Sequence, residues 1–115
     1  MPTETMERLL QGLQLTFFTY QDREHHGKPL AHWLVEEARA IGIGGATLVA
    51  ASEGFGHHRH IHSTHFIELA SPPVDVTMVV TPEESERLFA KLDAEEINVF
   101  YTKVPIEFGT TAAEE

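Results

Sequence analysis

Cysteine is absent from this 115-residue chain, which excludes both a disulfide framework and a thiolate site. Basic residues are few: eight Lys and Arg, scattered singly, stand against eighteen Asp and Glu and give a formal net charge of −10. Because the binding of nucleic-acid phosphates needs clustered Lys and Arg, this balance argues against a nucleic-acid partner. No apolar run reaches the length that spans a bilayer, so we expect no membrane insertion.

The segment Met1–Arg8 is acidic and lacks the basic-then-apolar pattern of a secretory signal, so we expect a cytoplasmic protein. A chain of this length forms one domain with a hydrophobic core of its own. We expect an N-terminal extension over residues 1–12, a domain over 13–108 that contains a loop excursion at 57–73, and a C-terminal tail over 109–115.

The spacing of apolar and aromatic residues predicts strands that alternate with helices. In chain order we expect a strand at 13–20, a polar loop at 21–27, a helix from Pro29 to a stop at Gly42, a strand at 45–53, a short strand at 66–69, a strand at 74–81, a helix that starts at Thr81, and a strand region at 98–108. Thr81 and Glu84 fit a capping box for the second helix. Pro105 would break the last strand region, which suits an edge of the sheet.

These elements predict an α+β fold, a ferredoxin-like βαββαβ sandwich in which two helices cover one face of the sheet. The opposite face of so small a sheet needs a cover, because a large exposed apolar face is a liability. Self-association is the simplest cover, and we therefore expect an oligomer.

The most informative stretch is an extended apolar run that ends in Gly54-Phe55-Gly56 and continues as His57-His58-Arg59-His60-Ile61-His62. Glycines around an aromatic residue let the backbone turn sharply and approach a ligand closely. A bulge that bends a strand out of the sheet explains the same glycines without any ligand. Both interpretations make this stretch the first place to look for function.

Several short motifs occur in an order that is specific as a set. They are His26-Gly27-Lys28-Pro29-Leu30, Ala38 with Gly42-Ile43, Gly45-Ala46-Thr47, Gly54-Phe55-Gly56 and Ile61-His62. In this order they resemble a PII-like family, long catalogued as a domain of unknown function and related to PII nitrogen-regulatory signalling proteins. The resemblance covers residues 13–107 and implies a non-catalytic homotrimer with the ferredoxin-like fold.

The resemblance also implies a small effector, an adenine nucleotide, held in the cleft between subunits. Gly45-Ala46-Thr47 would lie near its base, and the amides of Gly54-Phe55-Gly56 would face its phosphates. The loop His57–His65 would be the mobile element that contacts a protein partner, such as a channel, a transporter or an enzyme. His57, Arg59 and His62 are the further ligand-directed residues, and His62 occupies the Ile-His position of the family.

The chain departs from PII nitrogen-regulatory proteins at the positions that carry positive charge. Those proteins have Arg-Gln after Gly-Phe-Gly, a Lys-containing glycine-rich segment after the second helix, and a basic pair near the C-terminus. Here the corresponding positions hold His57 and His58, the segment Asp93–Ile97, and a lone Lys103. Most of the cationic phosphate clamp is therefore missing, and a weaker or less charged adenine nucleotide, or none, stays open.

A metal-binding trimer, similar to CutA-type proteins that share the fold, is the main alternative. On an extended segment His58, His60 and His62 point to one side, because side chains alternate along a strand. Three neutral imidazoles can bind a divalent transition metal such as zinc, copper or nickel and leave a coordination position open. Against this, the spacing matches no established zinc motif. A pure interaction module, whose loop docks a partner without a ligand, is the third interpretation.

The remaining candidates have simpler explanations. His25 and His26, beside Asp22 and Glu24, could form a second metal site, but a solvated loop before the first helix is the preferred interpretation. Trp33 should lie in the core or at a subunit interface. The chain lacks a nucleophile elbow of the Gly-x-Ser-x-Gly type, and we predict that the protein is not an enzyme.

Overall fold

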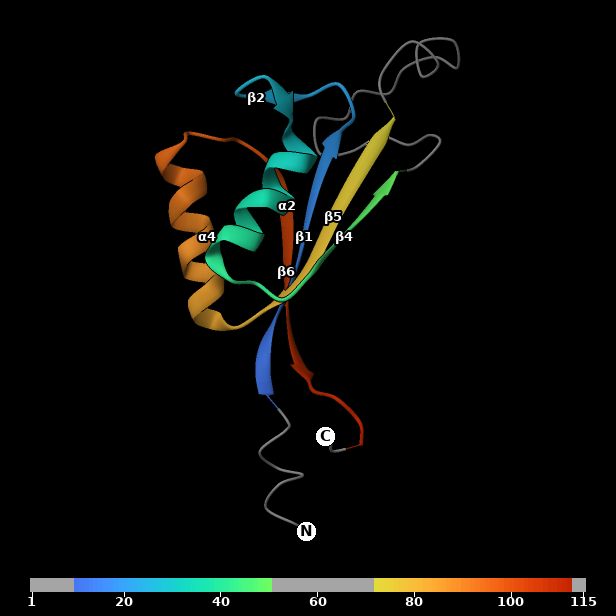
Figure 1. Cartoon of the computed structure of the whole chain (residues 1–115), viewed down its shortest axis with the longest axis vertical. Helices are drawn as coiled ribbons and strands as arrows, with labels where there is room; N and C mark the ends of the chain where they lie inside the picture. Colours follow the sequence, from blue (N-terminus) through green and yellow to red (C-terminus); the bar gives the residue numbers. More distant parts are fainter. Residues whose placement is uncertain (1–9, 51–71, 113–115) are drawn as a thin grey trace.

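The computed structural model describes residues 10–50 and 72–112, which form an antiparallel sheet with helices on one face (Figure 1). The elements are β1 (Leu10–Tyr20), β2 (Glu24–His25), β3 (Lys28–Pro29), α2 (Leu30–Ile41), β4 (Ala46–Ala50), β5 (Pro73–Val80), α4 (Pro82–Ala94) and β6 (Phe100–Phe108). The four-stranded sheet has the order β4-β5-β1-β6, and each neighbouring pair is antiparallel. The predicted ferredoxin-like α+β sandwich is confirmed.

The core is built on the two central strands, β1 and β5. Their side chains alternate between the two faces of the sheet, as in any strand. Leu15 and Phe17 of β1 are fully buried on the helix side, opposite Met78 and Val76 of β5 in the register. Helix α2 adds Leu34 to this core, with Trp33 beside it, so the expectation that Trp33 is buried is confirmed.

Local sequence signals mark the start of α4 and the end of α2. Thr81 Oγ1 accepts the N–H of Glu84 at 3.1 Å, and the Thr81 N–H donates to Glu84 Oε1 at 2.9 Å, which completes the predicted capping box of α4. Helix α2 ends at Gly42, whose φ of 103° is the left-handed conformation that favours glycine. Pro29 is the residue before the helix and not its first helical residue.

Two sequence expectations are wrong. The stretch 21–27 is not only a polar loop, because it contains β2 and both turn residues of a hairpin with β3. Strand β6 is also unbroken from Phe100 to Phe108, with Pro105 opposite Leu13. An edge strand tolerates proline at positions whose missing N–H would point away from the neighbouring strand. The predicted short strand at 66–69 and residues 57–71 of the predicted excursion at 57–73 lie outside the described residues, whereas Pro73 at the end of that excursion is the first residue of β5.

The face of the sheet opposite the helices carries apolar side chains and threonines. Val49 and Val104 are about half exposed there, and Phe100 packs against Phe18 with ring centroids 5.6 Å apart. The described residues provide no element that covers this face, as expected from the sequence. In the described part of the chain, no helix is both long and apolar enough to cross a bilayer.

Substitution of Gly12 by Ala should destabilise the fold through a steric clash. A Cβ at this position would lie 2.4 Å from the carbonyl oxygen of Val80 and 2.7 Å from the ring of Phe108. Strain of this kind typically lowers the free energy of unfolding by about 1–3 kcal/mol. Gly44→Ala is the matched control, because its added Cβ would meet no atom within 4 Å. Urea unfolding curves that show equal stability for the two variants would contradict this packing.

Candidate functional site

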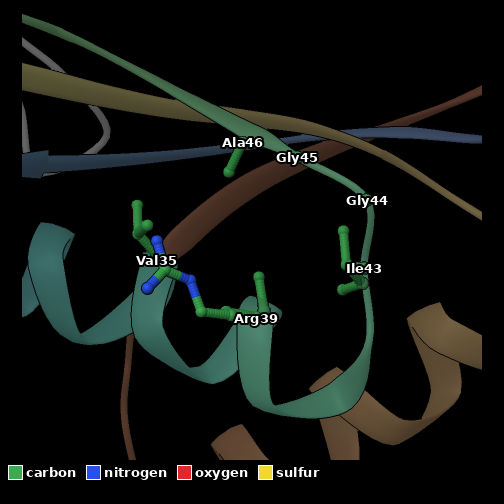
Figure 2. Close-up of a pocket in the computed structure, with 7 residues that line it drawn as sticks. Val35, Arg39, Ile43, Gly44, Gly45 and Ala46 are labelled. Atoms are coloured by element: carbon green, nitrogen blue, oxygen red, sulfur yellow. The ribbon is translucent and has the colours of Figure 1, made fainter.

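The segment that joins α2 to β4 forms one wall of a cavity. The N–H of Gly42 donates to the carbonyls of Ala38 and Arg39, which ends the helix, and the buried Ile43 then holds the chain against the core. Gly44 and Gly45 follow as exposed backbone up to the first residue of β4. The cavity has a volume of about 260 Å³ and is lined by Val35, Ala38, Arg39, Ile43, Gly44, Gly45 and Ala46 (Figure 2).

A larger cavity, of about 480 Å³, shares Gly44 and Gly45 with the first. Polar groups in its lining come from the sheet and the start of α4, and include the hydroxyl groups of Thr47 and Thr77 and the carboxyl group of Glu84. Thr47 and Thr77 are register partners in β4 and β5, so their side chains lie on one face of the sheet. The glycine segment therefore offers bare backbone to two neighbouring cavities.

Arg39 is the site residue that sequence reasoning missed. It lies in the last turn of α2, where a basic side chain also complements the helix dipole, so its position alone gives no functional signal. Figure 2 shows its side chain running along the helix beside Val35. Arg39 lines the first cavity and also a third, of about 320 Å³, that reaches Leu48. Among the described lining residues of all three cavities, it is the only Lys or Arg.

The structure brings together only part of the predicted ligand site. Gly45, Ala46 and Thr47 are contiguous at the start of β4 and line these cavities. The other predicted site residues lie outside the described residues: Gly54, Phe55, Gly56, His57, His58, Arg59, His60 and His62. Their roles in nucleotide or metal binding stay predictions.

The hairpin β2–β3 carries a second cluster of polar side chains, at the start of α2. Its two turn residues, His26 and Gly27, have φ values of 55° and 78°, the left-handed pair that a tight two-residue hairpin turn requires. The hairpin pairs His25 with Lys28 and is joined directly to α2. The Lys28 ammonium lies 2.6 Å from Glu36 Oε1 and lowers the pKa of that carboxyl. The sequence motif around Lys28 thus fixes the entry to the first helix.

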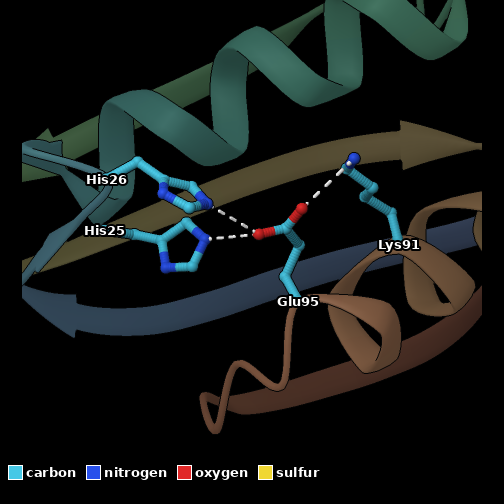
Figure 3. A network of polar contacts seen from close by, with 4 residues as sticks. All are labelled: His25, His26, Lys91 and Glu95. Atoms are coloured by element: carbon cyan, nitrogen blue, oxygen red, sulfur yellow. Dashed lines mark hydrogen bonds and ion pairs between the residues drawn. The ribbon is translucent and has the colours of Figure 1, made fainter.

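Both imidazoles of the hairpin converge on one carboxylate oxygen (Figure 3). The Nε2 atoms of His25 and His26 each lie 2.9 Å from Oε1 of Glu95, the residue that follows α4, and Lys91 Nζ lies 3.3 Å from Oε2. His25 is half-buried and its ring meets Trp33 edge-on, with centroids 4.9 Å apart. The interpretation of His25 and His26 as a solvated loop is therefore wrong for His25. The carboxylate that faces the two histidines belongs to Glu95, a residue that the sequence analysis did not single out.

These contacts lower the pKa of the Glu95 carboxyl group. Hydrogen bonds from His25 and then His26, with a further contribution from Lys91, lower the pKa of Glu95 from 4.5 to about 2. They favour the ionised carboxylate, which accepts all of them. Sequence reasoning missed Glu95 because it lies 70 residues from His25 and looks like an ordinary helix-end charge.

The contribution of Glu95 to the free energy of unfolding should fall as the pH falls from about 4.5 toward about 2. The folded pKa lies below the unfolded value, so acidification protonates the unfolded state first and favours it. Urea unfolding of the wild type and of Glu95→Gln, at about pH 6 and about pH 3 with a chelator present, measures this. The wild type should be the more stable at the higher pH, and its advantage should shrink at the lower pH. An advantage that does not change with pH would contradict this assignment.

The chain matches proteins of one family along most of its length. The DUF190 family, described as Uncharacterized ACR, COG1993, matches residues 12–105. A UPF0166 protein of Aquifex aeolicus (strain VF5) is 30% identical over 82 residues, which cover 71% of this chain and 78% of that protein.

Solved structures that share the fold include proteins described as PII-like. One, from Thermus thermophilus, has a TM-score of 0.61 and 21% identity, and the match covers 88% of this chain and 92% of that one. Another is CPII from Thiomonas intermedia K12, whose structure bound to ADP, AMP and acetate has a TM-score of 0.60 and 17% identity over 89% of this chain and 92% of that one. From its sequence match over residues 12–105, the chain belongs to the DUF190 family.

Proposed function

We propose that this protein is a non-catalytic PII-like regulator that binds an adenine nucleotide between the subunits of a homotrimer. The observation that carries the proposal is the Gly44–Thr47 segment, whose exposed backbone lines two cavities beside an edge strand. The comparison with CPII supports the choice of ligand, because that protein was solved bound to ADP and AMP. We also propose that the protein acts in the cytoplasm.

The chemistry of the cavities suits a nucleotide. Small-molecule sites are concave, largely apolar and supplied with a few placed polar groups. Here Val35 and Ile43 provide the apolar wall of the first cavity, and Gly44 and Gly45 add accessible amide and carbonyl groups. Arg39 supplies a permanent positive charge, which we assign to the phosphates. Each cavity is open on one subunit, and a neighbouring subunit would close it.

The uncovered face of the sheet supports an assembly. Val49, Val79, Phe100 and Val104 are each exposed by 39–54% there. Burial of such side chains against equivalent surfaces of two other copies removes apolar area from water and gives association its driving force. A homotrimer also places the edge strand β4 of one subunit near its neighbours, as a shared ligand cleft requires.

Signalling would pass through the loop His57–His65, which follows β4 in the chain. A ligand that binds one state of this loop more tightly shifts the population toward that state. The partner would then recognise that state, and we expect the partner to be a channel, a transporter or an enzyme. This step rests on the sequence alone, because the loop lies outside the described residues.

Calorimetric titration of metal-stripped protein with ATP, ADP, AMP and cyclic AMP tests the proposal. We expect saturable binding of at least one of them. Arg39→Ala should weaken that binding about tenfold, because the loss of one charge-assisted hydrogen bond lowers affinity by a factor of this size.

Arg87→Ala is the matched control for the loss of an arginine. Arg87 lies on α4 outside the linings of the three cavities, and its Nη2 lies 3.4 Å from the carbonyl oxygen of Ile41. Binding should survive in this variant. The absence of binding for all four nucleotides, or equal losses in the two arginine variants, would contradict the proposed site.

A further inference from the structure

The cluster of His25, His26 and Glu95 has the composition and convergence of a metal site. One ligand atom from each residue lies within 4.8 Å of the other two. We propose that these three side chains bind a divalent transition metal, with zinc as the best match, and that the metal joins the β2–β3 hairpin to the end of α4. This site is separate from the predicted loop histidines and does not depend on nucleotide binding.

The donor set fits zinc. Zinc takes imidazole nitrogen at about 2.0–2.1 Å and carboxylate oxygen at about 2.0–2.2 Å, and sites with three protein ligands keep a fourth position for water or another ligand. Ligand atoms of a tetrahedral site at these bond lengths lie about 3.3 Å apart. The two His–Glu separations are 2.9 Å, so each would have to lengthen by a few tenths of an ångström to admit the ion. The exposed His26 and the flexible stem of Glu95 can supply that shift.

The left-handed turn brings the two adjacent imidazoles together. Consecutive side chains of an extended strand point to opposite faces, so a neighbouring pair such as His25 and His26 would normally diverge. The φ of 55° at His26 reverses the chain and leaves the two ring centroids 4.1 Å apart. Such a left-handed conformation is unfavourable for a residue other than glycine. Trp33 holds the ring of His25 from one side, which fixes the direction of its Nε2.

Lys91 is the charged neighbour that opposes a cation here. Its ammonium lies 3.3 Å from Oε2 of Glu95, whereas both imidazoles face Oε1. The ammonium thus occupies one carboxylate oxygen and leaves the other for the metal. In the metal-free cluster the Nε2 atoms can donate protons to Oε1. In the metal-bound cluster the lone pairs of the same atoms bind the ion: a protonated imidazole releases one proton to solvent, and a neutral imidazole carries its proton on Nδ1.

Trp33 provides a local reporter, because it is the only tryptophan of the chain and its ring meets that of His25. We would titrate metal-stripped full-length protein with zinc chloride, without nucleotide, and follow calorimetric heat and Trp33 fluorescence together. The background is a variant with His58→Ala, His60→Ala and His62→Ala, which removes the predicted loop ligands. We expect saturable binding in this background that changes the Trp33 signal.

Two variants in the same background test the ligands. Glu95→Gln keeps the shape of the side chain, and His26→Ala changes an exposed residue, so neither should prevent folding. Each should weaken zinc affinity at least about tenfold, since loss of even an outer-shell partner has an effect of this size. His32→Ala, an exposed histidine on α2 outside the cluster, is the control and should bind as the background does.

Three results would overturn the proposal. They are the absence of a zinc-dependent Trp33 signal in the background variant, unchanged affinity in both Glu95→Gln and His26→Ala, and loss of all zinc binding when the loop histidines alone are removed. The last result would assign the metal to the loop. None of the three affects the nucleotide proposal, whose titrations are carried out without metal.

Discussion

The pairing of β1 with β5 is the constraint on which the rest of the structure depends. Because side chains alternate along each strand, this register places Leu15, Phe17, Val76 and Met78 on one face, where the helices bury them. A slip of either strand by one residue would turn that strand's buried side chains to the open face. The same register directs Phe18 away from the helices, so the residues that alternate with the buried ones form the open face of the sheet.

The positions of the two candidate sites depend on this pairing, because both sites lie at ends of helices that pack on the sheet. Helix α2 runs from the histidine hairpin at its start to the glycine segment at its end, a span of about 18 Å for 12 residues. The metal cluster and the nucleotide cavities therefore occupy opposite ends of one helix. Trp33 contacts the first and Arg39 lines the second, while Leu34 between them is fully buried.

Local signals allowed most of the fold to be predicted. The capping box at Thr81 and the helix stop at Gly42 each depend on a few neighbouring residues, and both are confirmed. The hairpin at His26 was missed because its turn holds histidine where asparagine or glycine is the usual signal. Pro105 was expected to interrupt β6, but an edge strand has backbone positions that need no donor.

The candidate sites were less predictable because they depend on residues far apart in the sequence. Glu95 faces His25 across 70 positions, a separation that no motif spacing reveals. Arg39 had no signal beyond its place in a helix, and only the cavity beside it indicates a role. Gly45, Ala46 and Thr47 were named from a family resemblance, and they do line cavities, but their part in ligand binding stays a prediction.

We propose that other copies of the chain close the uncovered face of the sheet and complete a ligand cleft between subunits. Light scattering coupled to size-exclusion chromatography measures this most directly on the full-length protein. We expect a mass three times the 12.9 kDa of one chain, stable on dilution through the micromolar range. A mass of one chain at all concentrations would contradict the shared cleft and the regulator built on it.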